Sequence, residues 1–418
     1  MHSRKLRTLV VCENLPYPSL KGGDLRTWQN VNALMRIGPV GVFGLCSNDK
    51  RAAVKPRAEI SFWRSSLDPA LSFPLTKDRK VTARAWLLNP DGHPADLYYS
   101  STAVAEICGV MAEFRPHVVV IERLWLHRYI DCVKSFGCRV VLDNHNVESA
   151  LYRQIGESAP GEDLQARLLR DTIPARTETI ERKASQAVDQ VWVCSREDER
   201  LMSRLYAHSA PVHVVPNGID VQHYSGIQDL NHCRVPDGTD RKAIVLPAAF
   251  AYPPNSKAAL FLIQKVWPCL SEIATDCRLL LVGSSPTPEM MTAAQGDSRI
   301  VITGAVPDVR PYITAASAMV VPLFEGGGTR FKILEAFASK TPVVSTATGA
   351  AGLRAKPGVH FLIAGSASDF VDGLKQLWAD ERLAAQLTED AFRLVTRFYS
   401  WNVASRKIEK AVQELTDS

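Results

Sequence analysis

The sequence lacks any apolar stretch near the roughly 20 residues that a membrane-spanning helix needs. Its basic start, MHSRKLR, leads into the apolar run Thr8 to Cys12, which ends at Glu13 and is too short for the apolar core of a signal peptide. We therefore expect a cytoplasmic protein. Contact with the inner face of a membrane stays open, because the segment Phe62 to Leu88 mixes aromatic side chains with Lys and Arg. The more ordinary interpretation of that segment is a partly buried excursion.

The sequence also lacks a CxxC pair and any long block of one charge. Its nine cysteines are an odd number scattered through apolar segments, as expected for reduced thiols in a cytoplasmic protein. The formal charge of +5 arises from 49 basic and 44 acidic residues spread along the chain. This mixture argues against a dedicated nucleic-acid surface and permits weak attraction to phosphorylated ligands or anionic membranes.

What the sequence has is a regular alternation of short aliphatic runs with helical patterns. A chain of 418 residues with 46% hydrophobic content can fill the cores of two or three domains. Aliphatic strands separated by helices indicate parallel sheets covered on both faces. The fold class is therefore α/β, with two doubly wound, Rossmann-like domains. The expected strands of the two halves are LRTLVVC (6–12), VGVFGL (40–45), HVVVI (117–121), RVVL (139–142), QVWVC (190–194), VHVV (212–215), AIVL (243–246), RLLLV (278–282), IVIT (300–303), SAMVVPL (317–323) and PVVS (342–345).

A polar, turn-rich segment without periodicity separates these two halves. We predict a first domain at residues 1–222, a linker at 223–241 and a second domain at 242–397. A final helix at 398–418 is expected to pack back on the first domain. The tract Ser149 to Gln186 is expected to be helical with interruptions at Gly161 and Pro174.

The most informative stretch is Pro322 to Pro342, PLFEGGGTRFKILEAFASKTP. The glycines after its strand let backbone amides approach a ligand, and the helix that follows offers its positive end to a phosphate. Lys332 adds a full charge, and Glu335 lies one turn later, where it can accept from ribose hydroxyls. The alternative is an ordinary turn with solvated charges.

Two motifs in the first half occupy corresponding positions at strand ends. Gly22 and Gly23 follow the first strand and begin a helix that carries Arg26, a second candidate start for phosphate binding. The strand RVVL ends in DNHNVE, which places His145 among several polar side chains at a strand tip. The alternative for this tip is a helix cap by Asn144 or Asn146, with Glu148 completing a capping box.

Taken together, these residues resemble retaining glycosyltransferases of family 4, which have the two-lobed GT-B architecture. The resemblance covers nearly the whole chain and is closest to a bacterial subgroup with the GGGTRxKILEA motif. It rests on the joint occurrence of several stretches in this order: PNGID (216–220), AYPPNSKAALFLIQKVWPCL (251–270), LLLVGSSP (279–286), VITGAVPDVRPYI (301–313), the GGG segment, and YSW (399–401).

The resemblance implies a transfer of sugar from a UDP- or GDP-sugar to a hydroxyl acceptor with retention. The acceptor class stays open between a saccharide, a lipid-linked sugar and a small metabolite. The resemblance assigns His145 to the transferred sugar, Glu335 to the ribose, and backbone groups at Val306 and Pro307 to the base. It assigns the donor diphosphate to Gly22, Gly23, Gly327, Gly328, Thr329, Arg330 and Lys332.

The sequence departs from the family pattern at two places. Many members have a glutamate near the sugar eight residues before the ribose-binding one, where this chain has Gly327, and Glu325 is the candidate replacement. Many members also carry an Arg and a Lys after the first strand of the second domain, where this chain has Asn255 and Lys257 as candidate replacements. Arg26 in the first domain is a further candidate for the phosphate site. No DxD motif is evident, so we expect a reaction without metal or cofactor, in which helix dipoles and Lys332 supply the positive charge.

Two other functions stay open at this point. A UDP-sugar 2-epimerase on the same fold would need additional acidic residues around the sugar, and no clear carboxylate pair is evident near His145 in the sequence. A nucleotide-binding relative without catalysis would explain the missing glutamate at Gly327.

Overall fold

The structure is a computed structural model that describes residues 6–19, 22–47, 49–53, 56–71, 92–157, 161, 164–207, 210–225, 242–326 and 330–417. Gly327, Gly328 and Thr329 of the predicted phosphate site lie outside these residues, as do most of the predicted linker and most of the segment Phe62 to Leu88. Contacts divide the chain into unit 1, Met1–Pro216 with Ala404–Ser418, and unit 2, Asn217–Val403. The first division thus falls at Pro216, before the predicted boundary at residue 222.

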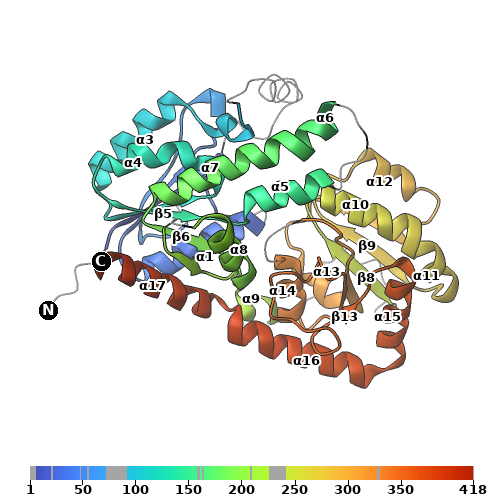
Figure 1. Cartoon of the computed structure of the whole chain (residues 1–418). Helices are drawn as coiled ribbons and strands as arrows, with labels where there is room; N and C mark the ends of the chain where they lie inside the picture. The colour runs from blue at the N-terminus through green and yellow to red at the C-terminus, as the bar shows by residue number, and fades with distance from the viewer. Residues whose placement is uncertain are drawn as a thin grey trace. The chain divides into compact units, whose positions relative to one another are not determined.

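Unit 1 contains a seven-stranded parallel sheet with helices on both faces (Figure 1). Its strands pack as continuous buried runs, such as TLVVC in the central strand β1, because both faces of the sheet are covered. In spatial order the strands are β3 (Ile60–Ser65), β2 (Val40–Gly44), β1 (Thr8–Cys12), β4 (Val118–Glu122), β5 (Arg139–Asp143), β6 (Gln190–Val193) and β7 (Val212–Val214).

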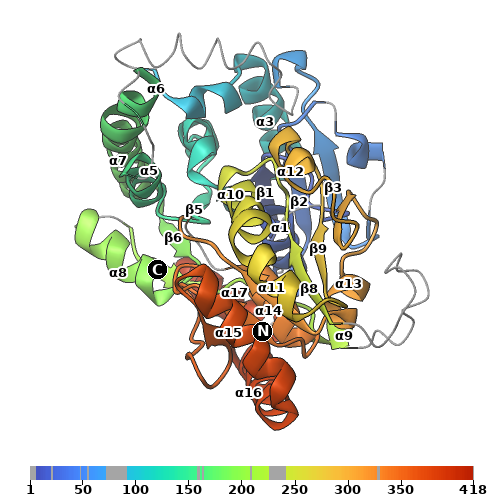
Figure 2. The same cartoon turned by 90° about the vertical axis from the view of Figure 1, so that its right-hand side faces the viewer.

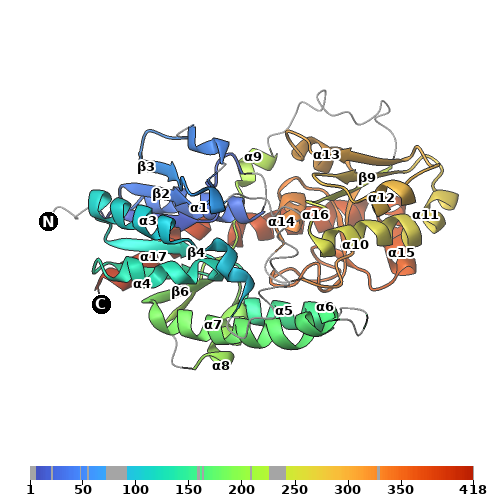
Figure 3. The same cartoon turned by 90° about the horizontal axis from the view of Figure 1, so that it is seen from above.

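The helices of unit 1 include two that extend side by side, α5 and α7 (Figures 1 and 3). The longer helices are α1 (Gly22–Met35), α3 (Ser101–Phe114), α4 (Ile130–Lys134), α5 (Glu148–Glu157), α6 (Leu164–Arg167), α7 (Ile173–Ala187), α8 (Arg196–Leu205) and α17 (Trp401–Asp417), with a π-helical turn at Leu168–Thr172 and 3-10 turns at Lys50–Ala53, Pro69–Leu71, Pro94–Tyr98 and Leu124–Tyr129.

Unit 2 contains a six-stranded parallel sheet in the order β10-β9-β8-β11-β12-β13, and α10 runs alongside β8 and β9 (Figure 2). The strands are β8 (Ala243–Pro247), β9 (Arg278–Val282), β10 (Ile300–Gly304), β11 (Ala318–Val321), β12 (Val343–Ser345) and β13 (Leu362–Ile363). The helices are α9 (Val221–Ser225), α10 (Pro253–Phe261), α11 (Trp267–Ile273), α12 (Pro288–Ala293), α13 (Arg310–Ala315), α14 (Phe331–Ala338), α15 (Ala367–Ala379) and α16 (Glu381–Phe398), with a π-helical turn at Leu262–Val266.

Both sheets follow the strand order of dinucleotide-binding folds, in which the first and fourth strands of the unit are neighbours. In unit 1 these neighbours are β1 and β4, and in unit 2 they are β8 and β11. The connections that leave two such strands run to opposite sides of the sheet, and the crevice that opens at the carboxyl ends is the usual place for a ligand. Each unit therefore has one such edge, and the predicted motifs can be located against it.

The segment that begins at Phe62 was predicted to be a partly buried excursion. Its first residues instead belong to a β-strand. Phe62 and Trp63 belong to the edge strand β3 and are only 5% and 7% exposed. Those two aromatic side chains are thus part of the core of unit 1 and not available to a membrane surface. None of the described helices combines the length and apolarity required to cross a bilayer.

Arg26 also differs from its predicted role as a candidate phosphate contact. Its side chain is 1% exposed and bonds to both carboxylate oxygens of Asp143, the last residue of β5. Its remaining nitrogen donates to the carbonyl of Val215 at 2.9 Å, and Gln29, one turn further along α1, donates to the carbonyl of Pro216 at 3.2 Å. Arg26 therefore joins α1 to β5 and to the last residues of unit 1 inside the core.

We expect the substitution Arg26→Met to lower the free energy of unfolding of unit 1 by about 3–5 kcal/mol, because it leaves the buried Asp143 carboxylate without its cation. Hydrogen exchange of the amides in β1, β4 and β5 measures this value. The control is Arg36→Met, which removes a surface pair with Glu409 and should cost under about 1 kcal/mol. Equal protection in the two variants would contradict the assignment.

Candidate functional site

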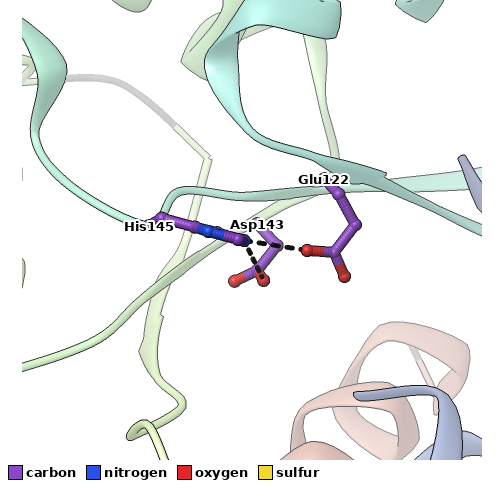
Figure 4. A group of neighbouring side chains, drawn as sticks. All are labelled: Glu122, Asp143 and His145. Atoms are coloured by element: carbon purple, nitrogen blue, oxygen red, sulfur yellow. Dashed lines mark hydrogen bonds and ion pairs between the residues drawn. The ribbon is translucent and has the colours of Figure 1, made fainter. Parts of the chain in front are cut away.

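The carboxyl edge of the sheet in unit 1 brings three titratable side chains together. Glu122 ends β4, Asp143 ends the neighbouring strand β5, and His145 follows two residues later, so all three reach the same side of the edge (Figure 4). Nε2 of His145 lies 2.9 Å from Oε2 of Glu122 and 3.6 Å from Oδ2 of Asp143. A carboxylate pair therefore does lie beside His145, which corrects the expectation from the sequence.

Helix α1 supplies the groups that hold these two carboxylates. Asn30 donates its amide to Oε1 of Glu122 at 3.1 Å and to Oδ2 of Asp143 at 2.8 Å, and the Thr27 hydroxyl lies 3.2 Å from Oε2 of Glu122. Arg26 is the cation between them. Asn30 follows Thr27 by three positions and Arg26 by four, so it lies beside both of them on α1.

Burial governs the protonation of this cluster. Desolvation raises the pKa of Glu122 and of Asp143, and in both cases the nearby charge of Arg26 opposes that rise. Desolvation, together with the charges of Arg123 and Arg26, lowers the pKa of His145 well below its ordinary value. The histidine is therefore a neutral imidazole at pH 7.

The same three side chains have ligand atoms within 4.8 Å of one another, close enough for a metal ion to be considered. Both oxygens of Asp143 already accept from Arg26, and both oxygens of Glu122 accept from Asn30, Thr27 or His145. A divalent cation would have to enter beside the buried guanidinium and displace these donors. The donor set thus fits a hydrogen-bond network better than a cation site.

Gly22 and Gly23 begin α1 at this edge, as predicted. The side chain of Arg123 packs against Gly23. A Cβ atom at Gly23 would lie 2.0 Å from Nη2 of Arg123, so the guanidinium packs directly on the glycine. Arg123 has a positive φ of 76° and pairs with Glu13 at 3.2 Å. A larger residue at this helix start would therefore have to displace the end of the Arg123 side chain.

The strand tip after Asp143 leads into α5, and its cap differs from the alternative that the sequence allowed. The backbone amides of Glu148 and Ser149 donate to the carboxylate of Glu181 in α7 at 2.9 and 3.3 Å. Asn146 donates to the side chain of Glu148, and the side-chain amide of the buried Asn144 forms no hydrogen bond with the described residues. A residue distant in sequence thus caps α5.

In unit 2, the helices that follow the neighbouring strands β8 and β11 place their first turns next to each other. Asn255 in α10 accepts from Nζ of Lys332 in α14 at 3.0 Å, and Lys257 pairs with Oε1 of Glu325 at 2.7 Å. Lys257 is 57% exposed at its side chain, whereas that of Glu325 is 9% exposed. The structure therefore brings together the four residues that the sequence proposed separately at this edge.

The environment of Lys332 depresses its affinity for a proton. Burial, and then the charge of Arg330, lowers the pKa of Lys332 to about 7, while Glu335 acts in the opposite direction. Arg330 immediately precedes α14, and its guanidinium packs against Gly326, where a Cβ atom would lie 2.8 Å away. Gly326 has a φ of 117°, so the loop and the arginine both require a glycine there.

Glu335 is held by Tyr224, a residue that the sequence did not single out. The tyrosine hydroxyl donates to Oε1 of Glu335 at 2.8 Å, and burial raises the pKa of this carboxyl group. Tyr224 lies in α9, directly after the PNGID segment, and the next carbonyl back, that of His223, accepts from Arg310 at 2.7 Å. Helix α9 thus connects α14 to the loop after β10.

The loop after β10 carries the residues predicted to flank a base. Val306 is partly buried against the core and Pro307 is exposed. Asp308, which follows them, is clamped by the guanidinium of Arg310 and contributes to the raised pKa of Glu335. The predicted ribose and base positions therefore lie near each other in unit 2.

Unit 2 also has an open cavity of about 810 Å³ at the carboxyl ends of β12 and β13. Its walls include Phe324, Thr346, Ile363, Asp369 and Asp372. Its lining does not include Lys332, Asn255, Lys257 or Glu325, but Phe324 directly precedes Glu325.

Two family models match the chain, one on each side of the boundary between the units. The model described as "Glycosyl transferase 4-like domain" matches residues 52–218, and the model described as "Glycosyl transferases group 1" matches residues 241–380. No curated protein matches the chain significantly in sequence.

Several solved structures share the fold over nearly the whole chain. Sucrose-phosphate synthase from Thermosynechococcus elongatus has a TM-score of 0.76 at 17% identity and covers 99% of this chain and 100% of its own. HepE from Anabaena, in complex with UDP and glucose, has a TM-score of 0.69 at 13% identity, with coverage of 98% and 100%. The trehalose-phosphate synthase from Burkholderia vietnamiensis has a TM-score of 0.65 at 12% identity, with coverage of 99% and 100%. The predicted GT-B fold is confirmed.

We expect Tyr224→Phe to lower the free energy of unfolding of unit 2 by about 1–3 kcal/mol, because it leaves the buried Glu335 carboxylate without a donor. Hydrogen exchange of the β8 and β11 amides measures the change. A double-mutant cycle with Glu335→Gln isolates the pair. Strictly additive effects in that cycle would show that the two side chains are not coupled.

Proposed function

We propose that this chain, which consists of two glycosyltransferase domains with the GT-B fold, transfers a sugar from a UDP- or GDP-sugar to a hydroxyl acceptor with retention. The observation that carries this proposal is the convergence of Lys332, Asn255, Lys257 and Glu325 where α10 and α14 begin. A related fold binds UDP and glucose in the Anabaena structure. The proposed location is cytoplasmic.

The diphosphate would lie at the first turn of α14. Backbone amides of this turn, the positive end of the helix and the charges of Arg330 and Lys332 all favour an anion there. Gly327, Gly328 and Thr329 belong to the same proposed loop by resemblance. Glu335, held by Tyr224, is positioned to accept from the ribose hydroxyls, and Val306 and Pro307 would flank the base.

The chemistry that these groups can supply is electrostatic. As the glycosidic bond breaks, negative charge grows on the leaving diphosphate, and preorganised cations lower the barrier in proportion to that charge. Lys332 fits this role because its neutral partner, the Asn255 carbonyl, holds it without consuming its charge. We assign His145 to the transferred sugar and Glu325 to the place of the glutamate that Gly327 lacks, with no metal required.

One observation also favours a second candidate, a UDP-sugar 2-epimerase. Glu122 and Asp143 supply the carboxylate pair beside a histidine that such a reaction would need. Both carboxylates are buried, at 1% and 0% exposure, and both are occupied by donors from α1, which leaves them poorly placed to move protons on a substrate. Transfer is therefore the better supported function.

The deciding experiment incubates the protein with a panel of UDP- and GDP-sugars and follows nucleotide release and the sugar products by NMR, with and without EDTA. Release or transfer with retained anomeric configuration is the expected result. Inversion at C2 without transfer would favour the epimerase, and binding without turnover would favour a non-catalytic protein. Lys332→Met should lower kcat/KM by about 10- to 100-fold. The exposed Lys340→Met serves as the matched control and should have no effect.

The depressed pKa of Lys332 predicts the pH dependence of nucleotide binding. A lysine whose pKa is about 7 when unliganded must take up a proton to bind a diphosphate above that pH. The affinity for UDP or GDP should therefore fall between pH 7.5 and 9.5, by up to about tenfold per unit. Calorimetric titration of the wild type and of Lys332→Met measures this slope, which should flatten in the variant and persist in Lys340→Met. Identical slopes in all three proteins would refute the role of Lys332.

A further inference from the structure

The two ring nitrogens of His145 have different surroundings. Nε2 faces Oε2 of Glu122 at 2.9 Å and Oδ2 of Asp143 at 3.6 Å. Oε1 of Glu122 accepts from the Asn30 amide and Oε2 accepts from the Thr27 hydroxyl, so these contacts place the carboxylate as an acceptor and a neutral imidazole beside it carries its proton on Nε2. Nδ1 forms no hydrogen bond with the residues that the structure describes, and the side chain is 10% exposed.

Glu122 is fixed more firmly than a surface carboxylate would be. It ends a central strand of the sheet and is 1% exposed. Asn30 bonds to Oε1, while Thr27 and His145 share Oε2, so both oxygens of the carboxylate are held by α1 and the histidine. A side chain held at both oxygens can orient the imidazole ring with little loss of entropy on binding.

We propose that Glu122 is a positioning residue for His145, which locks the Nε2–H tautomer and leaves Nδ1 as a hydrogen-bond acceptor for a substrate hydroxyl. This inference rests on the proposed function only for the identity of that substrate. The lone pair on Nδ1 would accept from a hydroxyl of the sugar, and no proton needs to leave the histidine. The Arg26 guanidinium donates to both oxygens of Asp143, so this second carboxylate is also placed as an acceptor beside the ring, and the charge of Arg26 opposes the rise in the pKa of Asp143 that burial causes.

The tautomer can be observed without any activity assay. The ¹⁵N–¹H multiple-bond spectrum of histidine-labelled protein at pH 7.5 distinguishes Nε2–H, Nδ1–H and charged rings, and the signals of His145 are those that disappear in His145→Gln. The expected spectrum is that of a neutral ring protonated on Nε2. A ring protonated on Nδ1, or a charged ring, would overturn the proposal, even if the protein transfers sugars.

Kinetics test the same role through the substrate. Glu122→Met removes the acceptor at similar volume, and we expect kcat to fall by about 10- to 100-fold with little change in KM for the donor. Glu122→Gln keeps an oxygen that can accept from Nε2–H and should restore most of that loss. Glu113→Gln, an exposed exchange of the same type in the same unit, is the control and should leave kcat unchanged.

The outcomes separate the two proposals. An unchanged kcat in Glu122→Met, or an equal loss in Glu122→Met and Glu122→Gln, would refute positioning through a hydrogen-bond acceptor. Circular dichroism and hydrogen exchange establish first that each variant is folded. If the wild type neither transfers nor hydrolyses any nucleotide sugar, the proposed function fails, while the tautomer spectrum still decides the state of His145.

Discussion

The structure of unit 1 depends on one electrostatic constraint: two carboxylates, Glu122 and Asp143, are buried next to each other, and the buried guanidinium of Arg26 pairs with Asp143. Glu122 and Asp143 end neighbouring parallel strands, so sheet geometry alone brings them close. Removing both from water is costly, and Arg26 with Asn30 offsets that cost by contributing a charge and directed hydrogen bonds. The contacts of α1 with β5, the contact of His145 with Glu122 and the bond from Arg26 to Val215 all belong to the network that satisfies this pair.

Unit 2 has the same strand order as unit 1, but its charged side chains have different kinds of partner. Its charged groups lie at an edge where each has a modest partner: an amide carbonyl for Lys332, an exposed lysine for Glu325 and a phenol for Glu335. The pair of Glu325 with the exposed Lys257 is inexpensive to exchange, because ion pairs with an exposed partner contribute little to stability, whereas the bond between Tyr224 and Glu335 is buried. Unit 1 is therefore organised around interactions that a ligand cannot replace, and unit 2 around interactions that a ligand can.

The sequence predicted the fold well because its signals are local. Aliphatic runs such as TLVVC and RLLLV read directly as buried parallel strands, and glycines at positions 23 and 326 marked real helix starts or tight loops.

The errors concern long-range contacts. Nothing near Arg26 in the chain indicated that Asp143 would meet it, and Glu122 lay one residue beyond the predicted strand HVVVI and was not considered. Tyr224 was overlooked because a buried tyrosine after PNGID has no periodic signature, and the cap from Glu181 could not be read from α5 itself. The strand β3 was missed because its aromatic residues resembled a surface segment.

The bonds from Arg26 and Gln29 to the carbonyls of Val215 and Pro216 have a consequence for recombining such domains. Because the acceptors are backbone groups, they tolerate side-chain exchanges at both positions, but they require α1 to be the native one. The chain also crosses back at Val403, and near that crossing Ile219 pairs with Tyr399 and Trp401 through backbone hydrogen bonds. A chimaera that imports a foreign second unit should therefore be joined at Asn217 and again at Ala404. The imported piece then includes both of the segments that pair near the crossing, those around Ile219 and Tyr399. The bonds from Arg26 and Gln29 to Val215 and Pro216 stay within the first unit.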